Sequence, residues 1–169
     1  MPHTPHGARP ATTFTTHPYT DDEAQVLIGE LMRDLSRRYG NGDDSEGDAT
    51  PVEPAEFEAP RGTFVIARRD GHPLGCVALR TVASPTDTVE LKRMWVREQA
   101  RGTGLGKELL AEAERRATAL GARRIILETG TAQPEAIALY EAHGYQSIPA
   151  FGYYAWSPLS RCFGKDLTG

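Results

Sequence analysis

The segment Arg101–Gly106, which reads RGTGLG, has the residue types of a phosphate-binding turn. Its three glycines carry no Cβ atom, so a ligand can approach the main chain closely. The residues that follow have a helical pattern, and main-chain N–H groups at a helix N-terminus attract anions together with the helix dipole. Arg101 and Lys107 add positive charge nearby. The segment therefore predicts a phosphate site where a loop becomes a helix.

Glycine spacing alone leaves a second interpretation open, a tight turn that requires positive φ angles. Two common nucleotide-binding motifs do not match. The P-loop pattern GxxxxGK[ST] places its glycines further apart. The dinucleotide pattern GxGxxG follows a strand that opens a βαβ unit, with an acidic residue about 20 positions later. Here the spacing is GxGxG, and three strands of antiparallel character precede it.

The wider pattern is more specific. Residues 96–110 read V-x4-R-G-x-G-x-G-K-x-L-L, which resembles the signature of the GNAT superfamily of acyl-CoA-dependent N-acyltransferases. Downstream, LETGTAQPEAIALYEAHGY resembles the second motif of that superfamily, N-x-x-A-x-x-L-Y-E-x-x-G-[FY]. The resemblance covers residues 64–167, and the N-terminal strand and helix more loosely. It implies a GNAT-like fold and the use of acetyl-CoA as acyl donor.

The resemblance also assigns cofactor contacts by position. In the superfamily, main-chain amides of the glycine-rich loop hold the CoA pyrophosphate, and the preceding strand pairs with the pantetheine arm. The second motif usually begins with Asn, whereas this chain has Gln133, which keeps the polarity but reaches further. The implied acetyl-CoA contacts are Met94, Trp95, Val96, Arg101, Gly102, Thr103, Gly104, Leu105, Gly106, Lys107, Gln133 and Tyr140.

Acyl transfer to an amine requires a proton acceptor. A lysine-like ammonium with a pKa of about 10.4 costs about 4.6 kcal/mol to deprotonate at pH 7. Glu90 is the candidate base, because it lies in the strand before the loop, where burial would increase its basicity. Its spacing to Arg101 also matches a glutamate base of some superfamily members. The alternative is a carboxylate paired with Lys92 or Arg93, and a bulge in this strand would break simple alternation.

Tyr140 is the candidate general acid, since the superfamily places a tyrosine at this position of LYE to protonate or hydrogen-bond the leaving thiolate. The alternative is an aromatic ring packed on the core. His143, one turn later, is better explained as a stabiliser of the helix end. Ser157, Ser160 and Cys162 lack a matching base, so no nucleophile is indicated. Direct attack in a ternary complex is therefore expected.

Two segments outside the motifs have an unusual composition. Residues 151–156, FGYYAW, could line the acceptor pocket, or they could form a packing hairpin or a dimer surface. Residues 41–60 contain seven acidic residues and three prolines, so we expect a mobile acidic loop inside the domain. Its charge could attract a cationic amine, although a solvated loop without that role is the simpler interpretation.

The surrounding patterns predict the elements that position these residues. Capping-box spacing at Thr20–Glu23 predicts the start of a helix, and Asp70-Gly71 predicts a tight hairpin. Strands are expected at 11–17, 64–68, 74–81, 88–96, 124–129, 145–148 and 161–167, and helices at 21–39, 104–120 and from Gln133-Pro134 to Gly144. This order predicts an α/β (α+β) fold with a mixed, mostly antiparallel central sheet and helices on both faces.

Bulk properties narrow the class of protein. The 169 residues suit one domain, 11–169, after a flexible tail at 1–10, and the net charge of −4 argues against nucleic-acid binding. Cys76 and Cys162 belong to no metal-ligand cluster and are expected as small apolar residues, so no metal is predicted. No apolar stretch of the roughly 20 residues of a membrane helix occurs, and no secretion signal, so we expect a cytoplasmic protein without membrane contact.

The sequence thus predicts an N-acetyltransferase that moves an acetyl group from acetyl-CoA to a primary amine of a small molecule. Two alternatives stay open, acetylation of a protein or peptide amine and a non-catalytic CoA-binding module. Analogy with the superfamily adds the expectation of a homodimer through the C-terminal strands.

Overall fold

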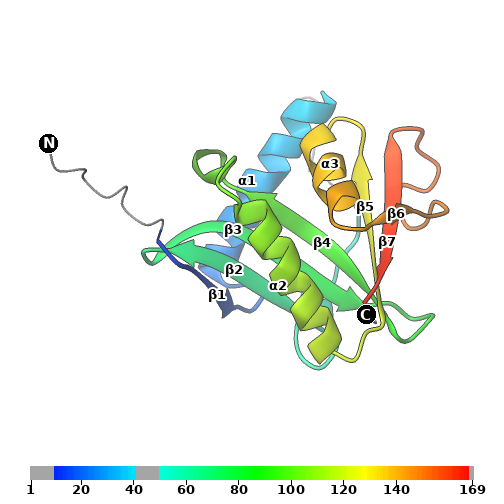
Figure 1. The fold of residues 1–169 in the computed structure, drawn as a ribbon, viewed down its shortest axis with the longest axis horizontal. Coiled ribbons are helices and arrows are strands. Elements are labelled where there is room, and N and C mark those ends of the chain that lie inside the picture. Colours follow the sequence, from blue (N-terminus) through cyan, green and yellow to red (C-terminus); the bar gives the residue numbers. More distant parts are fainter. Residues whose placement is uncertain (1–9, 41–49, 168–169) are drawn as a thin grey trace, which may run out of the picture.

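A mixed sheet forms the centre of the computed structural model, which describes residues 10–40 and 50–167 (Figure 1). In this part of the chain seven strands are ordered β1-β2-β3-β4-β5-β7-β6, and neighbours are antiparallel except for the parallel pair β4 and β5. The strands are β1 (Thr12–Thr16), β2 (Gly62–Arg69), β3 (His72–Thr81), β4 (Thr88–Val96), β5 (Arg124–Gly130), β6 (Gln146–Ser147) and β7 (Ser160–Asp166). The predicted fold class is confirmed.

Helices cover both faces of the sheet, with α1 behind it and α2 in front in Figure 1. Side chains of α2 and α3 share a core with one face, and side chains of α1 share a second core with the other. The helices are α1 (Asp22–Tyr39), α2 (Leu105–Ala119) and α3 (Pro134–Ala142), with short 3₁₀ turns η1 (Pro54–Phe57) and η2 (Glu98–Ala100). This agrees with the expectation of helices on both faces.

Alternation along β2 produces the two cores. Phe64 and Ile66 pack toward α1, whereas Val65 and Ala67 pack toward α2. Successive side chains of a strand point to opposite faces, so a run in which all four residues are apolar can bury both faces of a central strand. The sheet is therefore held as a middle layer between helices.

Local signals in the sequence mark most element ends. Asp70 and Gly71 both have positive φ angles, 51° and 77°, and close the predicted hairpin between β2 and β3. Gly40 ends α1 in the left-handed conformation, with φ 65°. The predicted capping box at Thr20–Glu23 is wrong by one residue, because Asp21 is the N-cap and accepts a hydrogen bond from the Ala24 amide at 2.8 Å.

Strand β4 contains a bulge opposite Val77. Cys76 pairs with Trp95 and Ala78 pairs with Lys92, so two residues of β4 oppose one of β3. Within this bulge Arg93 has a φ of 55°, which is rare for a residue with a side chain. The bulge shifts the alternation of the second half of β4, so Met94 joins the α2 core and Trp95 the α1 core.

The prediction for residues 41–60 requires correction. Residues 1–9 and 41–49 lie outside the described residues, so the tail and much of this loop are not tested. The remainder contains η1, whose Phe57 is 1% exposed and stacks on Tyr19 with ring centroids 4.8 Å apart. One aromatic residue in an acidic, proline-rich segment thus anchors it in the α1 core, which the composition alone did not indicate.

We predict that Phe57→Ala lowers the free energy of unfolding by about 3–5 kcal/mol, because it leaves a cavity beside Tyr19. Chemical denaturation measures the change. Glu58→Ala, at the exposed next position, is the control and should stay within about 0.5 kcal/mol of the wild type. A small effect of Phe57→Ala would show that this segment does not contribute to the core.

Candidate active site

The glycine-rich loop joins η2 to α2 and exposes main-chain amides. Gly102 and Gly104 have φ angles of 73° and 86°, and Gly104 is the N-cap of α2, where it offers no side chain to the free amides of the first turn. A Cβ atom on either glycine would meet nothing within 4 Å. The glycines are therefore required by backbone conformation, and the space over the amides is open to a ligand. The residues present fit a bound diphosphate.

The conformation of this loop is held by Thr103. Its hydroxyl donates to the Ala100 carbonyl at 2.5 Å and accepts from Arg69 Nη1 at 2.8 Å. Arg69 lies at the end of β2, so the loop is attached to the sheet independently of any ligand. Leu105, the first residue of α2, is buried in the core, whereas Lys107 is exposed beside the amides. Fixed amides lose little freedom on binding an anion.

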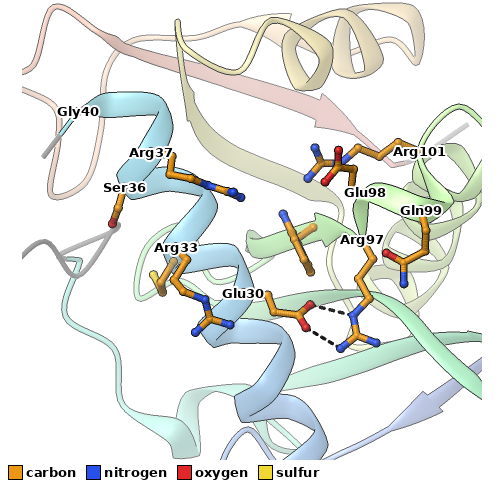
Figure 2. Close-up of a pocket in the computed structure, with 11 residues that line it drawn as sticks. Glu30, Arg33, Ser36, Arg37, Gly40, Arg97, Glu98, Gln99 and Arg101 are labelled. Atoms are coloured by element: carbon orange, nitrogen blue, oxygen red, sulfur yellow. Dashed lines mark hydrogen bonds and ion pairs between the residues drawn. The ribbon is translucent and has the colours of Figure 1, made fainter. Parts of the chain in front are cut away.

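The side chain of Arg101 turns toward α1 (Figure 2). Its Nε donates to the Val96 carbonyl at 3.0 Å, its Nη2 contacts Asp34 at 3.3 Å, and its guanidinium lies 5.9 Å from the centre of the Trp95 ring. We had expected this residue to add charge at the phosphate site. Its guanidinium is instead held against α1, so only the main chain of Arg101 is expected to contact the phosphate.

Asp34 of α1 joins the helix to the strand and the loop. Its carboxylate is buried and accepts from Trp95 Nε1 at 3.3 Å, Arg38 Nε at 3.2 Å and Arg101 Nη2 at 3.3 Å. Burial opposes ionisation of Asp34, but the hydrogen bond from Trp95 and the charges of Arg38 and Arg101 outweigh it and lower its pKa. The charged form thus ties together three elements, α1, β4 and the start of the glycine-rich loop.

Strands β4 and β5 part halfway along their length. Their parallel ladder covers Thr88–Leu91 and Arg124–Leu127, yet β4 continues to Val96 and β5 to Gly130. Main-chain groups of Met94–Val96 therefore lie on an edge that β5 does not cover. An extended polar chain such as a pantetheine arm can pair with such an edge as an added strand would. This geometry fits the contacts predicted for Met94, Trp95 and Val96.

A cavity of about 340 Å³ lies at the point where the two strands part. We call it the Tyr140 cavity. Its walls come from α1, β4, the end of β5, α3 with the residue before it, and the segment that leads into β7. The lining residues are Leu31, Leu35, Tyr39, Leu91, Lys92, Arg93, Met94, Glu128, Thr129, Gly130, Gln133, Tyr140, Tyr154, Trp156, Ser157, Leu159 and Ser160.

Tyr140 combines a buried ring with a hydroxyl at this cavity. The residue is 5% exposed, packs against Tyr145 and Phe163, and its hydroxyl lies 3.9 Å from Met94 Sδ. Burial raises the pKa of Tyr140, because a phenolate would lose its hydration there. The phenol therefore keeps its proton in the physiological range and can donate a hydrogen bond.

Glu90 lies apart from the Tyr140 cavity, of whose described lining it is not a member. The residue is 7% exposed, and its Oε1 receives Arg80 Nε at 3.0 Å and Nη2 at 2.9 Å. Lys92 Nζ is 3.9 Å from its other oxygen. These contacts favour the paired-carboxylate alternative, with Arg80 of the neighbouring strand as main partner in place of Arg93. The sequence did not reveal Arg80, because cross-strand register decides this pair.

Glu128 is a candidate base that sequence reasoning missed. It lies on β5 just past the point of parting and lines the Tyr140 cavity. Its Oε2 faces the turn at Gly152, where an added Cβ would lie 3.7 Å from it. A signal was present, a single carboxylate at the end of the apolar run IIL, inside the stretch that resembles the second motif. We had interpreted that run only as a buried strand.

The C-terminal end of α1 closes one side of the cavity. Tyr39 donates its hydroxyl to Gln133 Oε1 at 3.0 Å, and Arg38 Nη1 donates to the Ala132 carbonyl at 3.2 Å. A Cβ on Gly130 would lie 1.9 Å from the Tyr39 hydroxyl oxygen, so only glycine allows this docking. The side chain of Gln133, predicted to contact the cofactor, is thus already engaged with Tyr39.

The aromatic stretch at residues 151–156 consists of turns rather than a hairpin of strands. Tyr154 and Trp156 line the Tyr140 cavity, which favours the acceptor-pocket interpretation of this segment. His143 lies at the end of α3 with Nδ1 2.8 Å from the Leu139 carbonyl oxygen, as expected for a residue that stabilises a helix end.

Cys76 and Cys162 are free and buried, on β3 and β7, which confirms their interpretation as small apolar residues. Burial raises the pKa of the Cys76 thiol to about 12, so it is inert as a nucleophile. Over residues 10–40 and 50–167, no group of three or more potential metal ligands occurs. Within the same ranges, no helix has the length and apolarity needed to cross a membrane.

A second and larger cavity, about 810 Å³, lies between α1 and η2 (Figure 2). Arginines line it from both sides, but Arg97 is paired with Glu30 through contacts of 2.7 and 2.8 Å, and Arg101 is held by Asp34. The predicted cofactor residues Trp95 and Arg101 border this cavity, whereas Tyr140 and Glu128 do not. The groups suited to proton transfer therefore line the Tyr140 cavity and not this one.

Comparison with known proteins identifies the class. Residues 28–145 match the Acetyltransferase (GNAT) family, and the chain belongs to this family. It is 34% identical over 143 residues to an IAA acetyltransferase of Azospirillum brasilense, with 85% of this chain and 92% of the relative covered. A structure from Klebsiella pneumoniae described as an acyl-CoA N-acyltransferase has 32% identity and a TM-score of 0.72, with 93% and 98% of the two chains covered.

An N-acetyltransferase of Schizosaccharomyces pombe is 29% identical over 133 residues, which cover 77% of this chain and 78% of the relative. The chain is therefore an acyltransferase, and its family implies an acyl-CoA donor. The resemblance inferred from the two sequence motifs is confirmed.

We predict that Gly104→Ala weakens CoA binding by about tenfold or more, because the added methyl group forces a different backbone over the anion-binding amides. Calorimetric titration with CoA measures the loss. Gly121→Ala is a matched control, since Gly121 has a φ of 88°, similar open space and a position at the far end of α2. Both variants should lose about 1 kcal/mol of stability, but equal CoA affinity in both would exclude the loop as the phosphate site.

Proposed function

We propose that this protein transfers the acetyl group of acetyl-CoA to a primary amine of a small molecule, by direct attack within a ternary complex. The observation that carries the proposal is the Tyr140 cavity, which joins the uncovered edge of β4 to a buried phenol and a carboxylate. Donor, acid and base can therefore meet at one point, as positional catalysis requires.

Two successive parts of this chain would contact the acetyl-CoA donor. The amides of the glycine-rich loop would bind the diphosphate, and the main chain of Met94–Val96 would pair with the extended arm. Bound acetyl-CoA supplies an activated acetyl group. No covalent enzyme intermediate is needed, since the amine can attack the activated acetyl group directly when both substrates are bound.

Glu128 is the base that we propose in place of Glu90. Removing a proton from a lysine-like ammonium at pH 7 costs about 4.6 kcal/mol, so an acceptor within reach of the amine contributes directly to the rate. What supports Glu128 is its place on the lining of the cavity that contains Tyr140. Glu90 is a weaker candidate because of its double contact with Arg80. For Glu90 to accept a proton, this contact would have to break, or the amine would have to share the carboxylate with Arg80.

Tyr140 is the proposed partner of the leaving sulfur. A thiol has a pKa near 8.5, whereas burial raises the pKa of Tyr140 above its ordinary value of about 10. Complete transfer of the phenolic proton to a thiolate is therefore unfavourable. We propose that Tyr140 stabilises the developing thiolate by donating a hydrogen bond, and that solvent supplies the proton after release.

A small acceptor suits this site better than a folded protein. The volume of about 340 Å³ falls in the range of small-molecule pockets. The end of α1 also closes one wall through Tyr39 and Arg38, which limits the width available to a polypeptide.

Release of free thiol from acetyl-CoA on addition of amines tests the proposed activity. We predict that Glu128→Gln lowers kcat/KM by about a hundredfold, because the ammonium loses its proton acceptor. Glu90→Gln should reduce stability, since Arg80 loses its partner, but should keep kcat within about threefold. If Glu90→Gln abolishes turnover in a folded protein while Glu128→Gln does not, Glu90 is the base.

We predict that Tyr140→Phe lowers kcat by about tenfold or more and leaves CoA affinity near that of the wild type. The active form of Tyr140 is protonated and its pKa is raised, so its ionisation should not reduce the wild-type rate below about pH 10. A pH–rate profile checks this. Tyr145→Phe is the control, because its hydroxyl is also buried but lacks a hydrogen-bond partner and does not line the cavity. Equal kcat in both variants would remove Tyr140 from catalysis.

A further inference from the structure

Exposed apolar side chains concentrate at the mouth of the Tyr140 cavity. Among the described residues four large apolar side chains are exposed, and three of them lie close together in the chain, namely Tyr153, Trp156 and Leu159. Trp156 is 75% exposed although it lines the cavity. A ring left in water beside a cavity gains free energy when a ligand covers it, so this patch indicates a contact surface for an apolar group.

The rings at this mouth are oriented for aromatic contact. The ring centroids of Tyr154 and Trp156 are 6.5 Å apart with an angle of 47° between the planes. From α1, Leu31 and Leu35 contribute aliphatic side chains to the same lining. A flat apolar body in this cavity would contact both aromatic rings and aliphatic side chains.

One acidic side chain lies beside the aromatic segment. Glu128 is the acidic residue among the described lining residues. Lys92 and Arg93 also line the cavity, with Lys92 Nζ 3.9 Å from Glu90 and Arg93 Nε donating to the Tyr19 hydroxyl at 3.3 Å. Because Glu128 Oε2 faces Gly152, the carboxylate lies next to the aromatic segment itself. A ligand that satisfies both features has an ammonium group and an apolar ring.

We propose that the acceptor is an arylalkylamine, a primary amine joined by a short aliphatic linker to an aromatic ring. This inference rests on the proposed acetyltransferase function. The ring lies against Trp156 and Tyr154, and the ammonium points to Glu128. Glu128 takes one proton from the ammonium, the amine nitrogen forms a bond to the acetyl carbon, and the carbon–sulfur bond breaks. The products are an N-acetyl amine, free CoA thiol and one proton.

Other amine classes fit the lining less well. The carboxylate of an amino acid would leave water for a lining whose basic residues, Lys92 and Arg93, already contact Glu90 and Tyr19, and each further ammonium of a polyamine would lose hydration in a cavity with one described carboxylate. A sugar amine would bring hydroxyl groups to the apolar wall of α1. Each of these costs desolvation free energy that an arylalkylamine avoids.

The test is a thiol-release assay with acetyl-CoA and a panel of 2-phenylethylamine, tryptamine, hexylamine, phenylalanine, spermidine and a lysine-containing peptide. We predict that kcat/KM for the two arylalkylamines exceeds that for hexylamine and phenylalanine by about tenfold, the size of one aromatic contact. A higher kcat/KM for any of the other amines would overturn the inference and leave the acetyltransferase function in place. If CoA binds but no amine releases thiol, the function itself fails.

A second measurement distinguishes contact of the substrate with the Trp156 ring from effects on the site as a whole. Trp156→Ala should raise KM for 2-phenylethylamine by about tenfold while KM for acetyl-CoA stays unchanged, and Trp156→Phe should restore most of the affinity. Val26→Ala, which removes an exposed apolar side chain of α1, is the control and should change neither constant. If KM for 2-phenylethylamine is unchanged in Trp156→Ala, the assignment of this surface is overturned. The same holds if the variant changes the oligomeric state of the protein and not this KM.

Discussion

The parting of β4 and β5 is the constraint on which the site depends. A parallel pair normally satisfies the main chain of both strands, yet here the ladder stops at Leu91 and Leu127 while both strands continue. Unpaired main-chain groups are costly when buried, so water or a ligand in the gap must supply their hydrogen bonds. The bulge at Arg93 belongs to the same feature, because it turns the second half of β4 and places Met94 beside Tyr140.

Helix α1 converts this gap into a cavity of limited size. Its contacts include those of Asp34 with Trp95 and Arg101, of Tyr39 with Gln133, and of Arg38 with the loop before α3. The contact at Asp34 also attaches Arg101, the first residue of the glycine-rich loop, to α1. The two sides of the proposed site are thus connected through α1, as a site that orients two substrates requires.

Local signals made much of this arrangement predictable. Glycines with positive φ, a strand before them and a helix after them are sequential features, so the phosphate loop, the hairpin at Asp70-Gly71 and the helix ends could be predicted from neighbouring residues. Contacts between distant segments could not. Glu90 has its partner Arg80 across a strand pair, Phe57 enters the core from an acidic segment, and Glu128 faces a turn twenty-four residues away in the sequence.

The sequence by itself determined the class of protein, the order of its elements and the glycine-rich turn that we propose as the anion site, because each of these depends on residues close together in the chain. Only the tertiary structure decided which carboxylate accompanies Tyr140 and what lines the acceptor side. The physical reason is that register, the bulge in β4 and the docking of α1 against Gly130 set the direction of side chains, and these depend on packing between segments far apart in the sequence.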